Sequence, residues 1–263
     1  MRLGENEYTT RFSGLQGNPN YYTLDIVAAL SAIIVLVYYK KEKTVLLAIC
    51  LIALSVFGLM SVSKSFLLTW ILLLVCWFVL SIRQGFGKLF GSILVVTIGA
   101  MIVYYFAYDY INAFLFRFAA DNSGTLDSIT TGRTELWSLY LDEIFNNIRI
   151  LLFGNGLNTM IETLGKGAHN TYLEALFNLG IVGSTILIIS ICICMNRVKF
   201  KGVVWIPVMM LMIRMFAIGI LTYDNLWFYI SIPLMLACDH QKERAKNQTS
   251  IVRQLCSHEG FSL

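Results

Sequence analysis

Long apolar runs constrain this chain more than any other feature of its sequence. Of its 263 residues, 57% are hydrophobic and 14% are charged. Several apolar stretches reach or approach the roughly 20 residues that a helix needs to cross a bilayer. A soluble protein of this length has more charge and shorter apolar runs. The sequence therefore predicts an all-α polytopic membrane protein.

The length rule predicts about seven membrane spans. They cover residues 22–39, 45–60, 66–82, 89–107, 172–195, 203–221 and 226–238. We divide the chain into a tail with four spans (1–107), a loop (108–170), three spans (171–238) and a final tail (239–263). The loop is too long for a simple connection, so we expect it to carry function or structure of its own.

Basic residues in the short connections predict the orientation. They follow the first, third, fifth and last spans, as Lys40, Lys41, Lys43, Arg83, Lys88, Arg197, Lys199, Lys201, Lys242, Arg244, Lys246 and Arg253. All of these lie on one side if the N-terminus is outside, which agrees with the positive-inside rule. The turn at 61–65, the loop at 108–170 and the turn at 222–225 are then extracytoplasmic. The modest net charge of +4 does not suggest a nucleic-acid partner.

The cysteines do not predict a metal centre. Most of the six lie in or at the ends of apolar runs, where they are typical small apolar residues. Cys192 and Cys194 are too close for a CxxC motif, so we expect neither zinc nor a disulfide framework.

Basic residues on the predicted outer side are candidates for binding an anion. They are Arg11, Lys64, Arg117, Arg133, Arg149 and Lys166. We interpret Arg149 and Lys166 as solvated loop charges. Arg11 and Arg133 lie among turn residues, and arginine binds phosphate through two parallel hydrogen bonds. Such a cluster suits a lipid-linked diphosphate.

Residues 134–153 are predicted to form an amphipathic helix. One stripe carries Trp137, Leu141, Ile144, Ile148 and Leu151. The helix either lies at the membrane interface or packs on the bundle. Arg133 at its start adds charge to the positive end of the helix dipole, which favours an anion. Gly154 and Gly156 are expected to end it.

Two further residues stand out. His169 precedes the fifth span, where Thr171 and Glu174 have capping-box spacing. It is either a structural hydrogen-bonding group or a base kept neutral by the helix N-terminus. Arg214 lies within the sixth span, where a charge is costly. It is either functional or paired with Asp25 or Asp224. We expect Gly180 and Gly183 to allow close helix packing.

Several short segments on the predicted outer side form an ordered set. The segments are Arg11-Phe-Ser-Gly-Leu-Gln-Gly-Asn18-Pro19-Asn20, Ser63-Lys64-Ser65, Gly132-Arg133 with Trp137, Phe153-Gly154-Asn155-Gly156, and His169-Asn170-Thr-Tyr172-Leu173 with Gly180 and Gly183. In their order, spacing and shared predicted side they resemble the O-antigen ligase/O-antigen polymerase family of bacterial inner-membrane glycosyltransferases. The resemblance is specific and covers roughly Arg11 to the last span.

The resemblance implies transfer of an oligosaccharide from undecaprenyl diphosphate to a glycan, lipid or protein acceptor, outside the bacterial cytoplasmic membrane. His169 would be the general base for the acceptor hydroxyl. Arg11 and Arg133 would hold the leaving diphosphate. Lys64, Asn170, Glu174 and Arg214 are further candidates for substrate binding. The resemblance implies no metal or cofactor.

Members of that family usually have about a dozen spans, and this chain resembles their C-terminal half. It is then a truncated form, one product of a split gene that works with an N-terminal half protein, or a minimal form. Polymerase-type addition of repeat units and ligase-type transfer of a finished glycan both remain open. A transporter-like bundle with Arg214 on its path is the non-enzymatic alternative.

Overall fold

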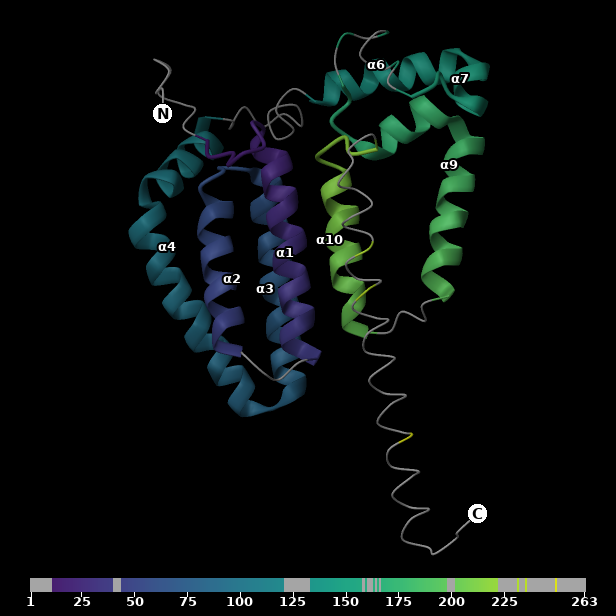
Figure 1. Cartoon of the computed structure of the whole chain (residues 1–263). Coiled ribbons are helices and arrows are strands. Elements are labelled where there is room, and N and C mark those ends of the chain that lie inside the picture. The colour runs from purple at the N-terminus through teal and green to yellow at the C-terminus, as the bar shows by residue number, and fades with distance from the viewer. Residues whose placement is uncertain are drawn as a thin grey trace, which may run out of the picture.

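The computed structural model describes residues 11–39, 44–120, 133–157, 167–197 and 202–221, with a few single positions besides. All regular structure in this part of the chain is helical (Figure 1). The elements are α1 (Pro19–Tyr39), α2 (Thr44–Leu59), α3 (Lys64–Gln84), α4 (Phe86–Ala120), α6 (Arg133–Asn146), α7 (Ile148–Phe153), α9 (Thr171–Arg197), the 3₁₀ turn η1 (Gly202–Val204) and α10 (Trp205–Met215).

Four of these helices are long and apolar enough to cross a membrane. They are Pro19–Tyr38, Lys64–Gln84, Phe86–Phe106 and Thr171–Ile193. The predicted all-α class is confirmed for the described residues, and the four helices indicate a membrane protein. The predicted second and sixth spans are shorter apolar helices, Leu46–Leu59 and Trp205–Met215. The predicted seventh span, at 226–238, lies outside the described residues.

The helix that contains the fourth span is longer than the span. The apolar span ends at Phe106, one residue before the predicted end at 107. Helix α4 continues beyond it to Ala120, into the region that we expected to be a loop. Residues 101–120 contain no glycine or proline, so nothing in the backbone stops the helix there.

The predicted single helix at 134–153 is two helices. Asn147 is extended, with φ −122°, and its side chain accepts hydrogen bonds from the amides of Arg149 (3.2 Å) and Ile150 (3.4 Å). It therefore caps α7 and interrupts the ladder after α6. The break changes which residues face inward: Ile144 is fully buried, whereas Ile148 is 66% exposed. The predicted stop at Gly154 is confirmed.

A kink in α9 was missed by the sequence analysis. Gly180 has φ 64° and ψ −175°, which interrupts the helix. The carbonyls of Phe177 and Asn178 accept hydrogen bonds from the amides of Asn155 (2.8 Å) and Gly156 (3.1 Å). A Cβ on Gly180 would lie 2.5 Å from the Gly154 nitrogen. Gly180 therefore does permit close packing, but against the turn after α7.

The sixth predicted span, at 203–221, is helical only in part. Helix α10 ends at Met215 after 11 residues. Residues 216–221, which we call the return segment, leave the helix while Ile218 and Ile220 stay buried. The amides of Phe216 and Ala217 still bond to the end of α10, whereas the backbone groups that follow bond to α1, α6 and α9.

The helices form two packed groups (Figure 1). Helices α1, α2, α3 and α10 share one apolar core, and α4 packs on α2 and α3. Helices α6, α7 and α9 share another core, with Tyr140, Ile144 and Phe177 fully buried. The return segment contacts both groups. Near it lie the starts of α1, α3 and α9 and the end of α10, and we call this end the motif end.

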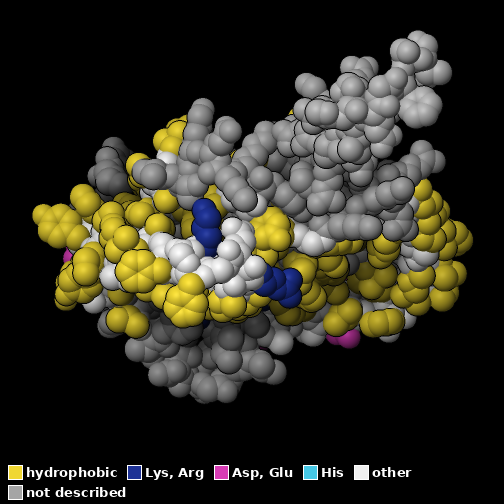
Figure 2. All heavy atoms as spheres, turned by 90° about the horizontal axis from the view of Figure 1, so that it is seen from below, with side chains coloured by type: hydrophobic (Ala, Val, Ile, Leu, Met, Phe, Trp, Pro, Cys, Tyr) yellow, Lys and Arg dark blue, Asp and Glu magenta, His cyan; other side chains and the backbone are white. Residues whose placement is uncertain are grey.

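The opposite end of the helices contains the turn between α3 and α4, and we call it the basic-turn end. Gly85 makes this turn with φ 109°, a left-handed value that favours glycine. Arg83 and Lys88 flank it. Figure 2 views the molecule from this side and shows a mostly apolar surface with Lys and Arg side chains at a few points.

Candidate functional site at the motif end

The return segment joins the two helix groups through its carbonyls. Three successive carbonyls each accept a side-chain hydrogen bond from a different part of the chain. These bonds run from Arg133 Nη1 to Ala217 O (2.9 Å), from Thr171 Oγ1 to Ile218 O (2.6 Å) and from Tyr21 OH to Gly219 O (2.7 Å). Buried carbonyls need such partners once the helix has ended. The segment is therefore held in one place by α1, α6 and α9 together.

The amides of the return segment bond to the start of α9. Ile220 N donates to Thr171 Oγ1 (3.1 Å), and Leu221 N donates to Glu174 Oε2 (3.4 Å). Thr171 is fully buried and Glu174 is 9% exposed. A Cβ on Gly219 would lie 2.7 Å from Glu174 Oε2, so glycine leaves room for this carboxylate.

This arrangement differs from the predicted capping box. Asn170, and not Thr171, caps α9: its Oδ1 accepts from the amides of Tyr172 (3.0 Å) and Leu173 (3.3 Å). Thr171 and Glu174 already lie inside the helix, and their side chains bond to the return segment instead of capping the helix. Asn170 therefore orients the helix start, and Glu174 anchors the segment that follows Arg214.

Arg214 is fully buried near the end of α10. Its Nη2 donates to Asn20 O and to Thr23 Oγ1, both at 2.8 Å, and its Nη1 donates to Ser65 Oγ. The alternative of a pair with Asp25 is not what the structure shows: Arg214 bonds to the three oxygens above, and the Asp25 carboxylate accepts from Gln16 Nε2 (2.7 Å). Asp224 lies outside the described residues. In the described part of the chain, neutral oxygens alone receive the hydrogen bonds of this guanidinium.

Arg11 belongs to the same polar network. Its Nε donates to Ser61 O (3.0 Å), and its Nη2 lies 3.5 Å from Asn20 Oδ1. Ser63 Oγ donates to that same Asn20 oxygen (3.1 Å) and lies 3.2 Å from Ser65 Oγ. The chain of contacts thus connects Arg11 to Arg214. Lys64 lies between these serines, half-buried at the first residue of α3.

His169 lies in the turn just before α9. Its backbone has φ 50°, in the left-handed region that histidine tolerates better than most side chains. The carbonyl of Ala168 accepts from Trp137 Nε1 (2.9 Å), which fixes the turn against α6. Ala168 and Asn170 are buried, whereas His169 is exposed. The backbone conformation therefore presents the imidazole at the surface between two buried neighbours.

The surroundings of His169 favour its neutral form. Partial desolvation, and then the positive charge of Arg133, lower the pKa of His169 below its usual value of 6.5. The sequence led us to expect a neutral ring because of the helix dipole, so the direction agrees but the cause differs. The positive charge of Arg133 also acts on the Arg214 guanidinium. The electrostatic surroundings of His169 and of Arg214 therefore both include Arg133.

A buried carboxylate lies on the α6 side of this site. Burial, and then the negative charge of Glu174, raise the pKa of Tyr140 to about 12. Glu174 therefore accepts a hydrogen bond from the return segment and also raises the pKa of Tyr140 in the core beside α6. Of the other basic residues on the predicted outer side, Arg149 is exposed on α7 and Lys166 lies outside the described residues.

Sequence reasoning missed several residues that build the site. Tyr21, Thr23 and Thr171 bond to Arg214 or to the return segment, yet none was a candidate. A polar residue in an apolar span, such as Thr23, was the available signal. The return segment had no such signal, because its backbone groups make the contacts. No protein-family model, curated protein or solved structure matches this chain.

Proposed function

We propose that this chain transfers a glycan from a lipid-linked diphosphate donor, of the undecaprenyl diphosphate type, to a sugar hydroxyl at the motif end. The observation that carries the proposal is the exposed His169 with a lowered pKa beside Arg133. Arg11 and Arg214 lie at the same end of the helices, joined by one hydrogen-bond network. The resemblance of the surrounding segments to the O-antigen ligase and polymerase family supports the same reaction.

In the proposed reaction, neutral His169 accepts the proton of the acceptor hydroxyl. The acceptor oxygen forms a bond to the anomeric carbon of the donor sugar. The bond from that carbon to the diphosphate oxygen breaks, and the diphosphate leaves with the electron pair. Fixed positive groups stabilise the charge that develops on the leaving oxygen. Arg133 and Arg11 are the proposed partners of the diphosphate, and Arg214 holds the region around Asn20 and Ser65 in place.

Charge distribution supports this division of roles. Arg133 Nη1 donates to Ala217 O, which fixes the position of a positive charge near His169. Arg214 is fully enclosed, so its contribution to the site is positioning and long-range positive potential.

Polymerase-type and ligase-type transfer use the same chemistry and differ in the acceptor. The proposal covers both, and polymerase-type addition is the form we put forward first.

The test is a transfer assay on the full chain in liposomes with an undecaprenyl-diphosphate-linked oligosaccharide and a sugar acceptor. His169→Gln keeps hydrogen bonding but removes the base, so transfer should fall on the order of a hundredfold to ten-thousandfold. The exposed position of His169 means that the variant should fold normally. Transfer at the wild-type rate by His169→Gln would rule out this residue as the base.

A second pair of variants tests the diphosphate contact. Arg133→Lys keeps the charge but loses the planar fork, so transfer should fall strongly. Arg149→Lys is the matched control, because Arg149 is exposed on α7 and belongs to no described network. Equal transfer activity in the two variants would show that Arg133 only holds Ala217 in place and does not bind the diphosphate.

A further inference from the structure

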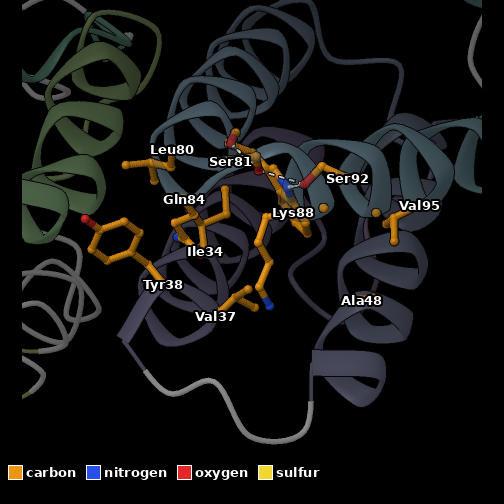
Figure 3. Close-up of a pocket in the computed structure, with 13 residues that line it drawn as sticks. Ile34, Val37, Tyr38, Ala48, Leu80, Ser81, Gln84, Lys88, Ser92 and Val95 are labelled. Atoms are coloured by element: carbon orange, nitrogen blue, oxygen red, sulfur yellow. Dashed lines mark hydrogen bonds between the residues drawn. The ribbon is translucent and has the colours of Figure 1, made fainter.

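A separate cavity lies at the basic-turn end of the molecule, between α1, α2, α3 and α4. It has a volume of about 350 Å³. Figure 3 shows the side chains that line it, with Tyr38, Gln84 and Lys88 among them and the pair Ser81 and Ser92 in its wall. None of these residues belongs to the motif end.

A second cavity continues from the first along the helices. It has a volume of about 280 Å³ and an almost wholly apolar lining. Ile34, Trp77 and Val95 line both cavities, so the two adjoin. Along α4 the lining extends from Lys88 to Tyr104, roughly 24 Å at the rise of an α-helix. That length is comparable with most of the hydrocarbon thickness of a bilayer, about 30 Å.

Glycines on α4 keep the first cavity open. Gly87 and Gly91 both line it, and a Cβ on either would meet no atom within 4 Å. The two residues are one helical turn apart and so lie on the same face. The two adjoining cavities therefore form an elongated, mostly apolar space with Lys88 in its lining at the basic-turn end, and we call this space the channel.

Three polar residues in the wall, Trp77, Ser81 and Ser92, already bond to one another. Trp77 Nε1 donates to Ser92 Oγ (2.7 Å), Ser92 Oγ lies 2.7 Å from Ser81 Oγ, and Ser81 Oγ donates to Trp77 O (2.8 Å). These groups do not need a polar ligand. Lys88 differs, because its side chain is exposed and has no carboxylate partner among the described residues.

The charges at this end complement an anion. Arg83 and Lys88 lie here, whereas each described acidic residue lies on α6 or toward the motif end of its helix: Asp25, Asp109, Glu135, Asp142, Glu143 and Glu174. An occupant of the channel must therefore combine a long apolar chain with a negative head. Phospholipids with an anionic headgroup have this chemistry, and basic residues near a membrane surface attract them.

We propose that the channel between α1, α2, α3 and α4 binds a phospholipid with an anionic headgroup. One acyl chain lies along Ile34, Trp77 and Val95, and the phosphate lies against Lys88. This site is independent of the proposed transferase reaction, since it uses other residues at the other end of the helices. A phospholipid bound there would connect helices α1, α2, α3 and α4 to the lipids of one leaflet.

The test is native mass spectrometry of the full chain, incubated in neutral detergent with equal amounts of phosphatidylglycerol and phosphatidylcholine of identical acyl chains. The wild-type chain should retain phosphatidylglycerol preferentially. Lys88→Gln should lower that preference about fivefold, the effect of one basic residue near a charged surface. Arg83→Gln is the charge-matched control at the same end, and it should change the preference less than twofold because Arg83 does not line the cavity.

Gly91→Leu tests the channel itself. The added side chain enters open space, so the helix should tolerate it while the bound lipid of either type decreases severalfold. Equal retention of the two lipids by the wild-type chain would overturn the proposal. So would an unchanged preference in Lys88→Gln, or full lipid retention in Gly91→Leu with an unchanged melting temperature.

Discussion

Polar residues and glycines lie in different surroundings at the motif end and at the basic-turn end. At the motif end, polar groups bond across large sequence separations, as Arg214 does to Asn20 and Thr171 to Ile218. At the basic-turn end, they bond within one helical hairpin, as Trp77 does to Ser92. Glycines also differ: Gly180 touches backbone, whereas Gly91 faces open space. The same substitution should therefore have different consequences at the two ends.

Gly180→Ala should have the largest effect on folding. The left-handed backbone at Gly180 disfavours a side chain, and the new Cβ would lie 2.5 Å from Gly154 N and from Leu152 O. Neither backbone atom can move without breaking the kink, so we expect a loss on the order of 3 kcal/mol or more. Thermal unfolding of the purified chain in detergent measures it.

The matched change at the other end is Gly91→Ala, which should leave the melting temperature unchanged or raise it, because alanine is the better helix former by about 1 kcal/mol. Equal melting temperatures for the two variants would contradict the contrast between the two ends.

Arg214→Lys should be the next most severe change. The variant keeps a buried positive charge but loses the fork that reaches Thr23, Ser65 and Asn20 O together. Lost hydrogen bonds to a charged group predict a cost of roughly 2–3 kcal/mol in unfolding free energy. Arg83→Lys, at an exposed position of the basic-turn end, should cost less than about 0.5 kcal/mol. If Arg214→Lys has the same unfolding free energy as the wild-type chain, the hydrogen bonds of Arg214 do not stabilise the position of α10.

Thr171→Val should have an intermediate effect. The hydroxyl accepts from Ile220 N and donates to Ile218 O, and both partners are buried. Its removal leaves them unsatisfied, at a cost of about 1–3 kcal/mol. Thr171→Ser keeps the hydroxyl and should recover most of the loss, and Thr97→Val on the exposed face of α4 should be nearly neutral. Faster hydrogen exchange at the Ile220 amide in Thr171→Val would locate the damage in the return segment.

The smallest effect should be the pH dependence of stability due to His169. Its pKa is lowered in the folded chain, so the unfolded chain binds the proton more readily. The contribution of His169 to stability is therefore fully present above about pH 6.5 and is lost as pH falls through the folded pKa. Between pH 7.5 and pH 5, the wild-type chain should lose slightly more stability than His169→Gln. A larger loss in the variant would reverse the sign and place a negative group near the ring.

Helices α1, α2 and α3 could be predicted to within three residues at each end, because their lengths follow from apolar runs bounded by polar or basic residues. The end of α4 could not, since residues 108–120 are compatible with both a helix and a loop. The break at Asn147 was missed because the apolar stripe continues across it from Ile144 to Ile148, although asparagine favours helix N-caps over helix interiors. The helical reading of 203–221 failed because the apolar pattern continues after the helix has ended.

The amino-acid sequence by itself determined the all-helical class, most helix positions and the identity of Arg11, Arg133, His169 and Arg214 as candidates. These follow from composition and from side-chain chemistry, which are local properties. Tertiary structure alone decided that Asn20 and Ser65 bind Arg214, that Glu174 binds the return segment, and that Gly180 bends α9 around Gly154. Each of these contacts joins residues that are far apart in the chain or involves a backbone group. Backbone groups are the same at every position, so only the packed fold selects which of them meet.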